Sequence, residues 1–126
     1  MTKSDSEKEK FLKTVKNLEE TLQKEKTEER RDSAIKRFEL CFDVSWKLIK
    51  LLLEEEKGII CNAPNDCFKQ AYIQGYIKYD DFWIKMTKER NAAVHTYDEK
   101  LADALYDKLP KFLELFESLK EKIECE

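Results

Sequence analysis

The sequence predicts an all-α protein, an antiparallel up-and-down bundle of four to five helices. Only two glycines and two prolines occur in 126 residues, so turn signals are few. Charged residues make up 40% of the chain, and many are lysine and glutamate, which favour helices. Apolar residues recur at spacings of three and four, the period of an amphipathic helix rather than of a strand. A chain of this length forms one hydrophobic core, so we expect a single helical-bundle domain over residues 1–126.

The first helix is expected from about residue 6 to residue 25, after a polar stretch at residues 1–5 that we expect to fray. One face of this helix is apolar and the other is rich in lysine and glutamate, as in a surface helix of a bundle. Residues 26–31 are charged apart from Thr27 and predict a short connection. The apolar stripe consists of Phe11, Leu12, Val15, Leu18 and Leu22.

The second helix is expected from about residue 32 to residue 57, with Asp32 or Ser33 as its N-cap and Gly58 at its C-terminal end. Further apolar residues widen its main stripe, so this helix is either central in the bundle or buried against a second subunit. The main stripe consists of Ala34, Ile35, Phe38, Cys41, Phe42, Ser45, Ile49 and Leu52, and the additional apolar residues are Val44, Trp46, Leu48, Leu51 and Leu53.

A short third helix is expected at about residues 65–74, because Pro64 suits a first helical turn and Gly75 ends the pattern. A fourth helix is expected to begin at Asp80 or Asp81. The inward residues of the third helix are Phe68, Ala71 and Tyr72, and those of the fourth are Phe82, Trp83, Met86, Ala93 and Val94.

The fifth helix is expected to begin after Asp98, which is suited to an N-cap. Pro110 lies inside this helix and removes one backbone donor, so we expect it to kink the helix or to split it in two. The apolar stripe consists of Leu101, Leu105, Leu109, Phe112, Leu113, Phe116, Leu119 and Ile123.

The segment from Arg90 to Tyr97 carries the residues best suited to chemistry, because it holds the only histidine of the chain. Arginine is permanently charged, and its planar fork matches a phosphate. Histidine titrates near neutral pH and can transfer a proton. Together they suit metal-independent RNA cleavage, in which the 2′-hydroxyl attacks the adjacent phosphate, His95 moves a proton and Arg90 stabilises the transition state. In this hypothesis Asn91 positions the imidazole or the sugar, and Tyr97 places a hydroxyl nearby.

The spacing of Arg90 and His95 restricts how they can act together. Five residues of helix turn by about 140°, so the two side chains do not share a face of one straight helix. They converge only if the helix ends at about His95, if Arg90 wraps around it, or if two copies of the chain face each other. A competing interpretation is that both residues only cap the carbonyls at a helix end, where cations are favoured.

The composition argues against several classes of function. A net charge of −3 disfavours a broad nucleic-acid surface, so no DNA binding is expected. No phosphate-binding glycine loop can be built from Gly58 and Gly75, which argues against ATP or dinucleotide binding and leaves no cofactor expected. No apolar run approaches the ~18 residues of a membrane span, and no secretion signal is visible, so we expect a cytoplasmic protein.

No metal site is expected, because the four cysteines form no CxxC pair and one histidine does not complete an ordinary zinc site. Cys41 lies in an apolar run and is expected in the core. Cys61 and Cys67 are six residues apart, and we expect them to remain free thiols in a reducing compartment.

Two further patterns have a structural and a functional interpretation. Glu39 and Asp43 are four residues apart on the second helix and could bind a divalent ion, but ion pairs with Arg37 or Lys47 are the simpler interpretation. The two tryptophans of the chain are expected in the core rather than as a platform for stacking bases.

The motif Arg90-x4-His95-x-Tyr97 resembles the Arg-x4–6-His signature of HEPN domains, in the subset with the extended Arg-x4-His-x-Tyr form. A polar residue after the arginine, here Asn91, is also usual. The resemblance covers nearly the whole chain, because other segments are similar to the nucleotidyltransferase substrate-binding protein family. These segments are residues 31–40 with Phe42, Trp46 and Lys47, the Ala63-Pro64 pair with the short helix after it, the Asp81-Phe82-Trp83 region, and residues 95–98.

The resemblance implies a HEPN-like bundle that forms a homodimer, with the arginine and histidine of both subunits near the two-fold axis. It also implies a partner, a minimal nucleotidyltransferase encoded by a neighbouring gene. In one alternative the dimer is a metal-independent endoribonuclease, the toxin of a toxin–antitoxin pair, and the nucleotidyltransferase is the antitoxin that silences it by adding AMP to Tyr97. In the other, the chain is the non-catalytic substrate-binding subunit of a two-component nucleotidyltransferase that modifies a small substrate. The complete set of Arg90, Asn91, His95 and Tyr97 favours the first alternative.

Overall fold

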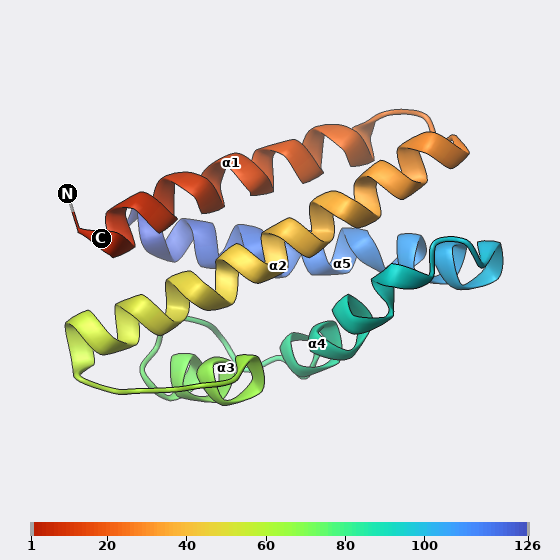
Figure 1. Cartoon of the computed structure of the whole chain (residues 1–126). Helices are drawn as coiled ribbons and strands as arrows, with labels where there is room; N and C mark the ends of the chain where they lie inside the picture. Colours follow the sequence, from red (N-terminus) through yellow and green to blue (C-terminus); the bar gives the residue numbers. More distant parts are fainter. Residues whose placement is uncertain (1, 126) are drawn as a thin grey trace.

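Three long helices form the body of the protein, and two shorter ones complete a fourth column beside them (Figure 1). The computed structural model describes residues 2–125, and these contain no strand, which confirms the predicted all-α bundle. No helix of this part of the chain combines the length and the apolar character needed to cross a bilayer. The elements are, in chain order, α1 (Lys3–Gln23), α2 (Glu28–Lys57), α3 (Pro64–Ile73), α4 (Phe82–Ala92), the 3-10 turn η1 (Ala93–His95) and α5 (Glu99–Glu124).

The helices run back and forth along one axis. The long helices α1, α2 and α5 pack against one another, whereas α3 and α4 follow one another along α2. Both termini lie at one end of the bundle, and the α1–α2 and α4–α5 connections lie at the other (Figure 1). The segment Arg90–Tyr97 therefore lies at the end of the bundle opposite the termini.

Aromatic rings from all five helices meet in the core. Phe116 of α5 packs against Phe11 of α1 and Phe38 of α2, with ring centroids 6.3 Å apart in each pair. Trp83 of α4 contacts Phe116 at 6.1 Å and Phe68 of α3 at 4.9 Å. Aromatic pairs in such arrangements contribute about 0.5–1.5 kcal/mol each beyond the area that they bury. The prediction that Trp83 lies in the core is confirmed, and its ring fixes α4 to the rest of the bundle.

The first helix begins earlier than predicted because its N-terminus is capped. The Thr2 hydroxyl accepts a hydrogen bond from the Asp5 amide, and the Asp5 carboxylate accepts one from the Thr2 amide, both at 3.1 Å. Ser4 is buried and donates to Glu55 near the end of α2 at 2.5 Å. The predicted fraying of this terminus is therefore wrong for the described residues, and Met1 lies outside them.

The second helix also begins earlier than predicted. Thr27 is its N-cap, and the Thr27 hydroxyl accepts a hydrogen bond from the Arg30 amide at 3.1 Å. Acidic residues in the first turn suit the positive end of the helix dipole. The prediction of a connection at residues 26–31, followed by a cap at Asp32 or Ser33, is therefore wrong.

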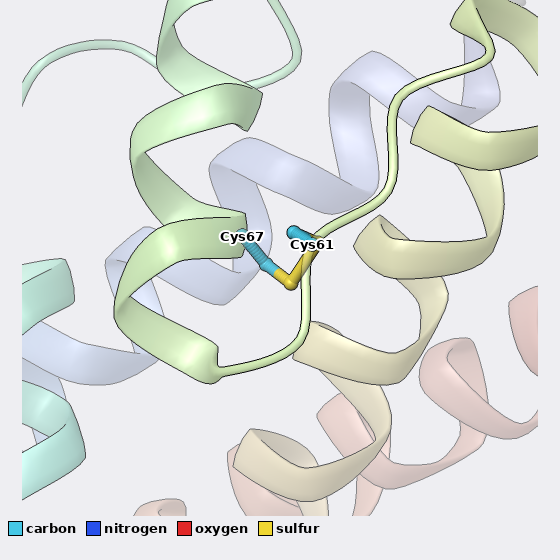
Figure 2. The surroundings of a disulfide bond; sticks show 2 residues. All are labelled: Cys61 and Cys67. Carbon is cyan, nitrogen blue, oxygen red and sulfur yellow. A yellow bond between two sulfur atoms is a disulfide. The ribbon is translucent and has the colours of Figure 1, made fainter.

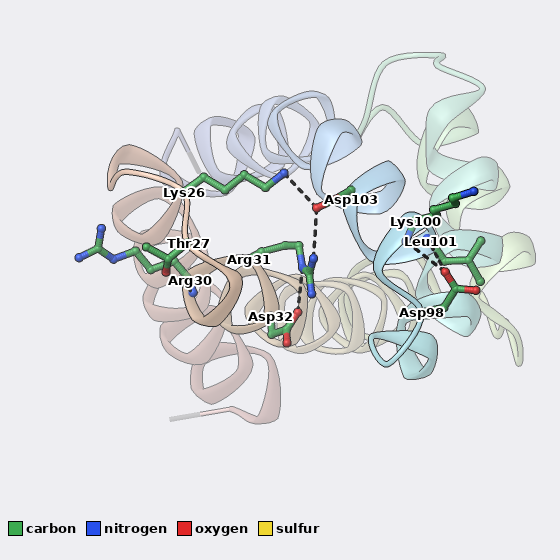
Figure 3. Close-up of polar contacts among 9 residues, drawn as sticks. All are labelled: Lys26, Thr27, Arg30, Arg31, Asp32, Asp98, Lys100, Leu101 and Asp103. Carbon is green, nitrogen blue, oxygen red and sulfur yellow. Dashed lines mark hydrogen bonds and ion pairs between the residues drawn. The ribbon is translucent and has the colours of Figure 1, made fainter.

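Arg31 is the buried charge of this first turn, and only 4% of it is exposed. Its guanidinium donates to Asp32 at 3.0 Å and to Asp103 of α5 at 3.2 Å (Figure 3). Lys26 also reaches Asp103, at 3.0 Å. These contacts join the start of α2 to the first part of α5.

The last helix runs without a break through Pro110. Pro110 is exposed, so the carbonyl that it leaves without an amide donor lies toward solvent. The predicted split into two helices is wrong, while the kink stays a prediction. The predicted N-cap is confirmed, because Asp98 accepts hydrogen bonds from the Lys100 and Leu101 amides at 3.1 and 3.2 Å (Figure 3).

Three residues predicted to face inward are exposed. They are Tyr72, Val94 and Leu101, with exposed fractions of 49%, 61% and 52%. Val94 lies in η1, where the tighter 3-10 turn changes the phase of the apolar pattern that α4 follows. Of the two tryptophans, Trp46 is only half-buried, although it packs against the core.

Cys61 and Cys67 form a disulfide, which corrects the expectation of free thiols (Figure 2). The loop after α2 returns toward the start of α3 and brings the two Cα atoms to 5.3 Å, within the range of a disulfide. Both residues are buried. Cys41 lies in the core as predicted, and burial raises the pKa of its thiol to about 12.

Candidate functional site

The motif segment spans the end of α4, the turn η1 and the connection to α5. The α-helix ends at Ala92, and buried Ala93 holds η1 against α2 and α5. The His95 carbonyl accepts a hydrogen bond from the Asp98 amide at 3.0 Å, which closes the turn before α5 begins. The α-helix therefore ends three residues before His95. A helix end at about His95 is one of the three arrangements in which Arg90 and His95 could converge.

Arg90 is held by two carboxylates of α2. Its Nε and Nη2 atoms donate to the two carboxylate oxygens of Asp43, each at 3.1 Å, in a bidentate geometry. Its Nη1 atom lies 3.4 Å from Glu39 Oε2. The interpretation of these acids as ion-pair partners of an arginine is confirmed, but the arginine is Arg90 of α4 and not Arg37 of their own helix, and Lys47 is not their partner either.

These contacts orient the guanidinium without using all of it. The hydrogen bonds that Arg90 donates to Asp43 raise the pKa of Arg90, while its burial opposes this shift, so the side chain stays charged. Asp43 takes two of the five N–H donors of an arginine, and the Arg90 side chain is 25% exposed. Terminal N–H groups of Arg90 therefore remain to bind an anion such as a phosphate.

The divalent-ion interpretation of Glu39 and Asp43 lacks further ligands. Within residues 2–125, no group of three or more histidine, cysteine, aspartate or glutamate side chains is placed to hold a metal ion. Both carboxylates instead compensate the charge of Arg90.

His95 is half-buried at the end of η1 and contacts Tyr97. Its Nδ1 atom lies 2.8 Å from the Tyr97 hydroxyl oxygen, and the two rings meet edge to face. In one neutral tautomer Nδ1–H donates to the Tyr97 oxygen, and in the other the Tyr97 hydroxyl donates to Nδ1. Because Tyr97 can stabilise both tautomers, the Nε2 atom of His95 can serve either as a proton acceptor or as a proton donor.

The motif residues form two groups rather than one. Arg90 binds the carboxylates of α2, whereas His95 binds Tyr97. No hydrogen bond or ion pair joins Arg90 to His95 among the contacts of residues 2–125, and Asn91 is exposed and makes none of these contacts. The described part of one chain therefore presents an anion-binding group and a proton-transfer group that are close in sequence but have separate partners.

Three large side chains of the motif segment and the start of α5 are exposed. Val94, Tyr97 and Leu101 have exposed fractions of 61%, 79% and 52%. Large apolar side chains that form an exposed patch are typical of surfaces that a partner covers. The sequence predicts Val94 and Leu101 as core residues, but no part of the described chain buries them.

Sequence reasoning missed the role of Glu39 and Asp43 as the partners of Arg90. A signal for them was present, since two acids four residues apart on the central helix share one face. The missing information was which cation of another helix packs against that face.

Three comparisons with known proteins agree with this fold. The family model described as "Nucleotidyltransferase substrate binding protein like" matches residues 7–125. A Haemophilus influenzae protein named "Probable ribonuclease HepT" is 30% identical over 84 residues, which are 64% of this chain and 58% of that protein. The match thus spans less than two thirds of this relative.

Two solved structures are similar. A protein from Thermus thermophilus superposes with a TM-score of 0.81 at 30% identity, over 86% of this chain and 94% of that one. A Haemophilus influenzae protein, described as revealing the fold of a substrate binding domain of a nucleotidyltransferase, superposes with a TM-score of 0.72 over 96% of each chain. At 23% identity, this second likeness shows a shared fold.

Proposed function

The chain belongs to the nucleotidyltransferase substrate-binding protein-like family, and we propose that it is a HEPN-type partner of a minimal nucleotidyltransferase. Its activity in this proposal is metal-independent endoribonucleolytic cleavage, as the toxin of a toxin–antitoxin pair. Adenylylation (AMPylation) of Tyr97 by the nucleotidyltransferase silences it. The name of the Haemophilus influenzae relative supports the ribonuclease part of this proposal.

One observation carries the proposal, the hydrogen bond between His95 and Tyr97 at 2.8 Å. It engages Nδ1 and leaves Nε2 for proton transfer. It also couples the exposed tyrosine to the histidine, so a change at the tyrosine oxygen alters the histidine directly. A purely structural helix cap requires neither property.

The cleavage step needs no group beyond those of the motif and the RNA. The Nε2 atom of neutral His95 takes the proton of a 2′-hydroxyl, the 2′-oxygen bonds to phosphorus, and the bond from phosphorus to the 5′-oxygen breaks. A protonated histidine returns a proton to the leaving 5′-oxygen, which yields a 2′,3′-cyclic phosphate and a 5′-hydroxyl. Arg90 binds the non-bridging oxygens, whose charge grows in the transition state, and Asn91 positions the sugar.

Two copies of the chain complete this site in the proposal. Arg90 and His95 have separate partners within one chain, so a two-fold axis beside η1 would bring the arginine of one copy to the histidine of the other. The exposed apolar residues Val94, Tyr97 and Leu101 would be covered in such a dimer.

AMP transfer to Tyr97 explains silencing in physical terms. The tyrosine oxygen attacks the α-phosphorus of ATP, the new O–P bond replaces the bond to pyrophosphate, and the hydroxyl proton is released. Tyr97 then has no O–H to donate to His95 and carries a negative phosphodiester where the RNA phosphate must bind. Tyr97 is 79% exposed, which gives a modifying enzyme access to it.

Cleavage is tested with single-stranded and structured RNA in the presence of EDTA. We expect the wild-type protein to cut RNA and His95→Ala to cut it at least about 100-fold more slowly, because general acid–base catalysis contributes about 10²–10⁴-fold. Thr87→Ala, at an exposed hydrogen bond from α4 to α3, is a matched control that should retain activity. No cleavage by the wild type, or equal cleavage by His95→Ala, would contradict the proposal.

The composite site is tested by mixing two inactive variants, Arg90→Ala and His95→Ala. If each site takes its arginine and histidine from different copies, mixed dimers contain one intact site, and the mixture should regain cleavage about tenfold or more above either variant alone. Sedimentation of each variant verifies that dimers form. A mixture as inactive as its components, although dimeric, would show that the two residues act within one chain.

Modification is tested by intact mass after incubation with the neighbour-encoded nucleotidyltransferase and ATP. We expect the mass to rise by one adenylate and cleavage to stop, and Tyr97→Phe to show no such rise. Tyr106→Phe, a tyrosine of α5, is the matched control and should still be modified at Tyr97. An increase in mass by one adenylate that also occurs in Tyr97→Phe would show that another residue is modified.

A second candidate function is a non-catalytic substrate-binding subunit of a two-component nucleotidyltransferase for a small substrate. The observation that favours it is the compensation of the Arg90 charge by Asp43 and Glu39, since a catalytic arginine is expected to be more open. A nucleotidyltransferase whose activity depends on this subunit, together with RNA that stays intact, would support it. A complex whose activity ignores this subunit would exclude it.

A further inference from the structure

An apolar groove lies between α3 and the start of α4, away from the motif. Its volume is about 270 Å³. Phe68 and Trp83 form its floor, with ring centroids 4.9 Å apart, and both are buried. The floor belongs to the core, but much of the wall consists of exposed side chains of α3 and of the segment between α3 and α4.

Two exposed tyrosines form part of the walls. Tyr72 and Tyr79 are 49% and 69% exposed, and their rings meet edge to face with centroids 5.5 Å apart. The Tyr79 hydroxyl donates to Asp81 at 2.5 Å. This hydrogen bond raises the pKa of Tyr79 and holds its ring in position. Rings held in place at a surface lose little conformational entropy when a flat ligand stacks on them.

The charges around the groove favour an anionic ligand. Lys69 and Lys78 line it, and neither takes part in an ion pair among the contacts of residues 2–125. Two acids also line it: Asp80 pairs with Lys111 at 3.2 Å, whereas Asp81 accepts a hydrogen bond from the neutral Tyr79 hydroxyl and keeps its charge. The two lysines therefore outnumber the one acid without a cationic partner, and the lining carries a net positive charge.

One face of α4 connects the groove with the motif. Ile84 lines the groove, and Lys88 and Asn91 follow it at helical spacings of four and three, all exposed. Lys88 takes part in no ion pair among those contacts. From Ile84 to Asn91 the helix rises about 10 Å, roughly the length of three stacked nucleotides.

We propose that this groove binds an unpaired base of the RNA substrate, about three nucleotides from the scissile phosphate. Tyr72 and Tyr79 stack on the base, and Lys69, Lys78 and Lys88 contact the phosphates between groove and motif. Stacking on aromatic rings combined with backbone contacts by lysine is a common way of binding single strands. This inference rests on the proposed function, since it assigns a binding subsite to the same substrate.

The volume fits this ligand better than a folded RNA or a larger cofactor. Pockets for drug-sized ligands begin at about 300 Å³, so a groove of this size holds one flat ring system. A protein segment is the competing ligand, because exposed tyrosine and isoleucine side chains also occur at protein interfaces. The lysines without an ion-pair partner, together with the exposed face of α4 that leads from the groove to Lys88 and Asn91, favour RNA.

Binding is measured separately from cleavage, with a fluorescein-labelled 2′-O-methyl RNA that lacks the attacking hydroxyl. We expect fluorescence anisotropy to show that Tyr72→Ala/Tyr79→Ala binds about tenfold or more weakly than the wild type, because each stacked ring contributes roughly fivefold or more. Tyr72→Phe/Tyr79→Phe should bind more tightly than the alanine variant, because the rings remain to stack, but more weakly than the wild type, because the hydrogen bond that positions the Tyr79 ring is lost. Tyr106→Ala, on α5, is the matched control, and thermal melting verifies that each variant is folded.

The lysines are tested through salt dependence. Lys69→Gln/Lys78→Gln should reduce the slope of log K against log salt by about 1.4, at about 0.7 for each lost phosphate contact to a single strand. Lys13→Gln/Lys16→Gln, two exposed lysines of α1, should leave the slope unchanged. An unchanged slope for the groove variant would overturn the proposed phosphate contacts.

The outcomes separate this inference from the ribonuclease proposal. The subsite is overturned if Tyr72→Ala/Tyr79→Ala binds the RNA as tightly as the wild type does, or if the wild type does not bind it, even when RNA is cleaved. It is supported if the alanine variant binds the RNA more weakly as expected, even when no RNA is cut. Unchanged RNA affinity combined with loss of the nucleotidyltransferase complex or of the dimer would assign the groove to a protein partner and overturn the proposal.

Discussion

Two arginines of this protein make similar contacts in very different surroundings. Arg31 at the start of α2 and Arg90 at the end of α4 each contact two carboxylates, at distances of 3.0 to 3.4 Å. The side chain of Arg31 is 5% exposed, and that of Arg90 is 25% exposed. Burial lowers the pKa of Arg31, but its hydrogen bonds to Asp32 and Asp103 outweigh burial and raise it overall.

The difference shows that ion-pair geometry does not by itself separate a structural arginine from a site arginine. Arg31 has a terminal nitrogen, Nη2, that is buried and has no hydrogen-bond partner in the described chain. A phosphate of an RNA strand cannot reach a side chain that is almost completely covered. Arg90 keeps an exposed part that an anion can reach, so in the proposed function accessibility, and not the number of carboxylates, distinguishes the two roles.

The strongest test of this comparison is lysine at position 90. Arg90→Lys keeps the positive charge but loses the planar fork, so the ammonium cannot bind Asp43 bidentately and still contact a phosphate. We expect RNA cleavage to fall about 10²–10³-fold, the usual cost of removing a donor that stabilises transition-state charge. The melting temperature should change little, because the site is partly exposed. Arg37→Lys, on α2, is the control and should cleave like the wild type.

The corresponding change at Arg31 should lower the stability of the fold and leave RNA cleavage unchanged. Arg31→Lys leaves one compact ammonium where a fork reached two carboxylates, in a place with almost no solvent. We expect the free energy of unfolding to fall by about 1–3 kcal/mol in urea titrations, with cleavage per folded molecule unchanged. The exposed neighbour Arg30→Lys should stay within about 0.5 kcal/mol of the wild type. A loss of cleavage without loss of stability in Arg31→Lys would remove the distinction between the two arginines.

The carboxylates of the two arginines should also differ in effect. Asp43→Asn removes the charge that orients Arg90, and we expect kcat for cleavage to fall about tenfold, with a smaller change in KM, because small errors of orientation are costly in catalysis. Asp32→Asn, the carboxylate beside Arg31, should not change kcat. Faster cleavage by Asp43→Asn would mean that Asp43 competes with the phosphate for Arg90 instead of positioning the guanidinium.

The helices could be predicted from the sequence because their apolar periodicity is local information. Asp98 could be predicted as an N-cap because it precedes a clear apolar stripe. Thr27 could not, since the charged residues after it hid the start of α2, and the burial of Arg31 depends on Asp103 of another helix. Tyr72 was misassigned because a helix as short as α3 has too few turns for the period to define its inner face.

The candidate residues could be named from the sequence, but their contacts could not. Arg90 and Asp43 are 47 residues apart, and only the packing of α4 on α2 brings them together. The hydrogen bond between His95 and Tyr97 needs the end of the α-helix at Ala92, which the apolar pattern placed later because Val94 continued it. The disulfide likewise depends on the path of the loop after α2 and not on the six-residue spacing alone.

The smallest expected effect is on the pH dependence of the melting temperature, through Asp103, which binds Arg31. Hydrogen bonds from Lys26 and then Arg31 lower the pKa of Asp103 in the folded state. A lowered carboxylate pKa stabilises the fold above the unfolded-state pKa of about 3.9, and this contribution is lost as the pH falls through the folded-state pKa. Asp103→Asn should therefore melt at a lower temperature than the wild type at pH 7, and the difference should shrink between about pH 4 and pH 2.

The shift in melting temperature should be small because the Asp103 side chain is 48% exposed and water screens its charge. Asp107→Asn, an exposed aspartate one turn further along α5, should show no such pH-dependent difference. If Asp103→Asn and the wild type lose stability in parallel from pH 7 to pH 2, the contacts of Asp103 contribute nothing measurable, and Asp32 is the carboxylate that compensates the charge of Arg31.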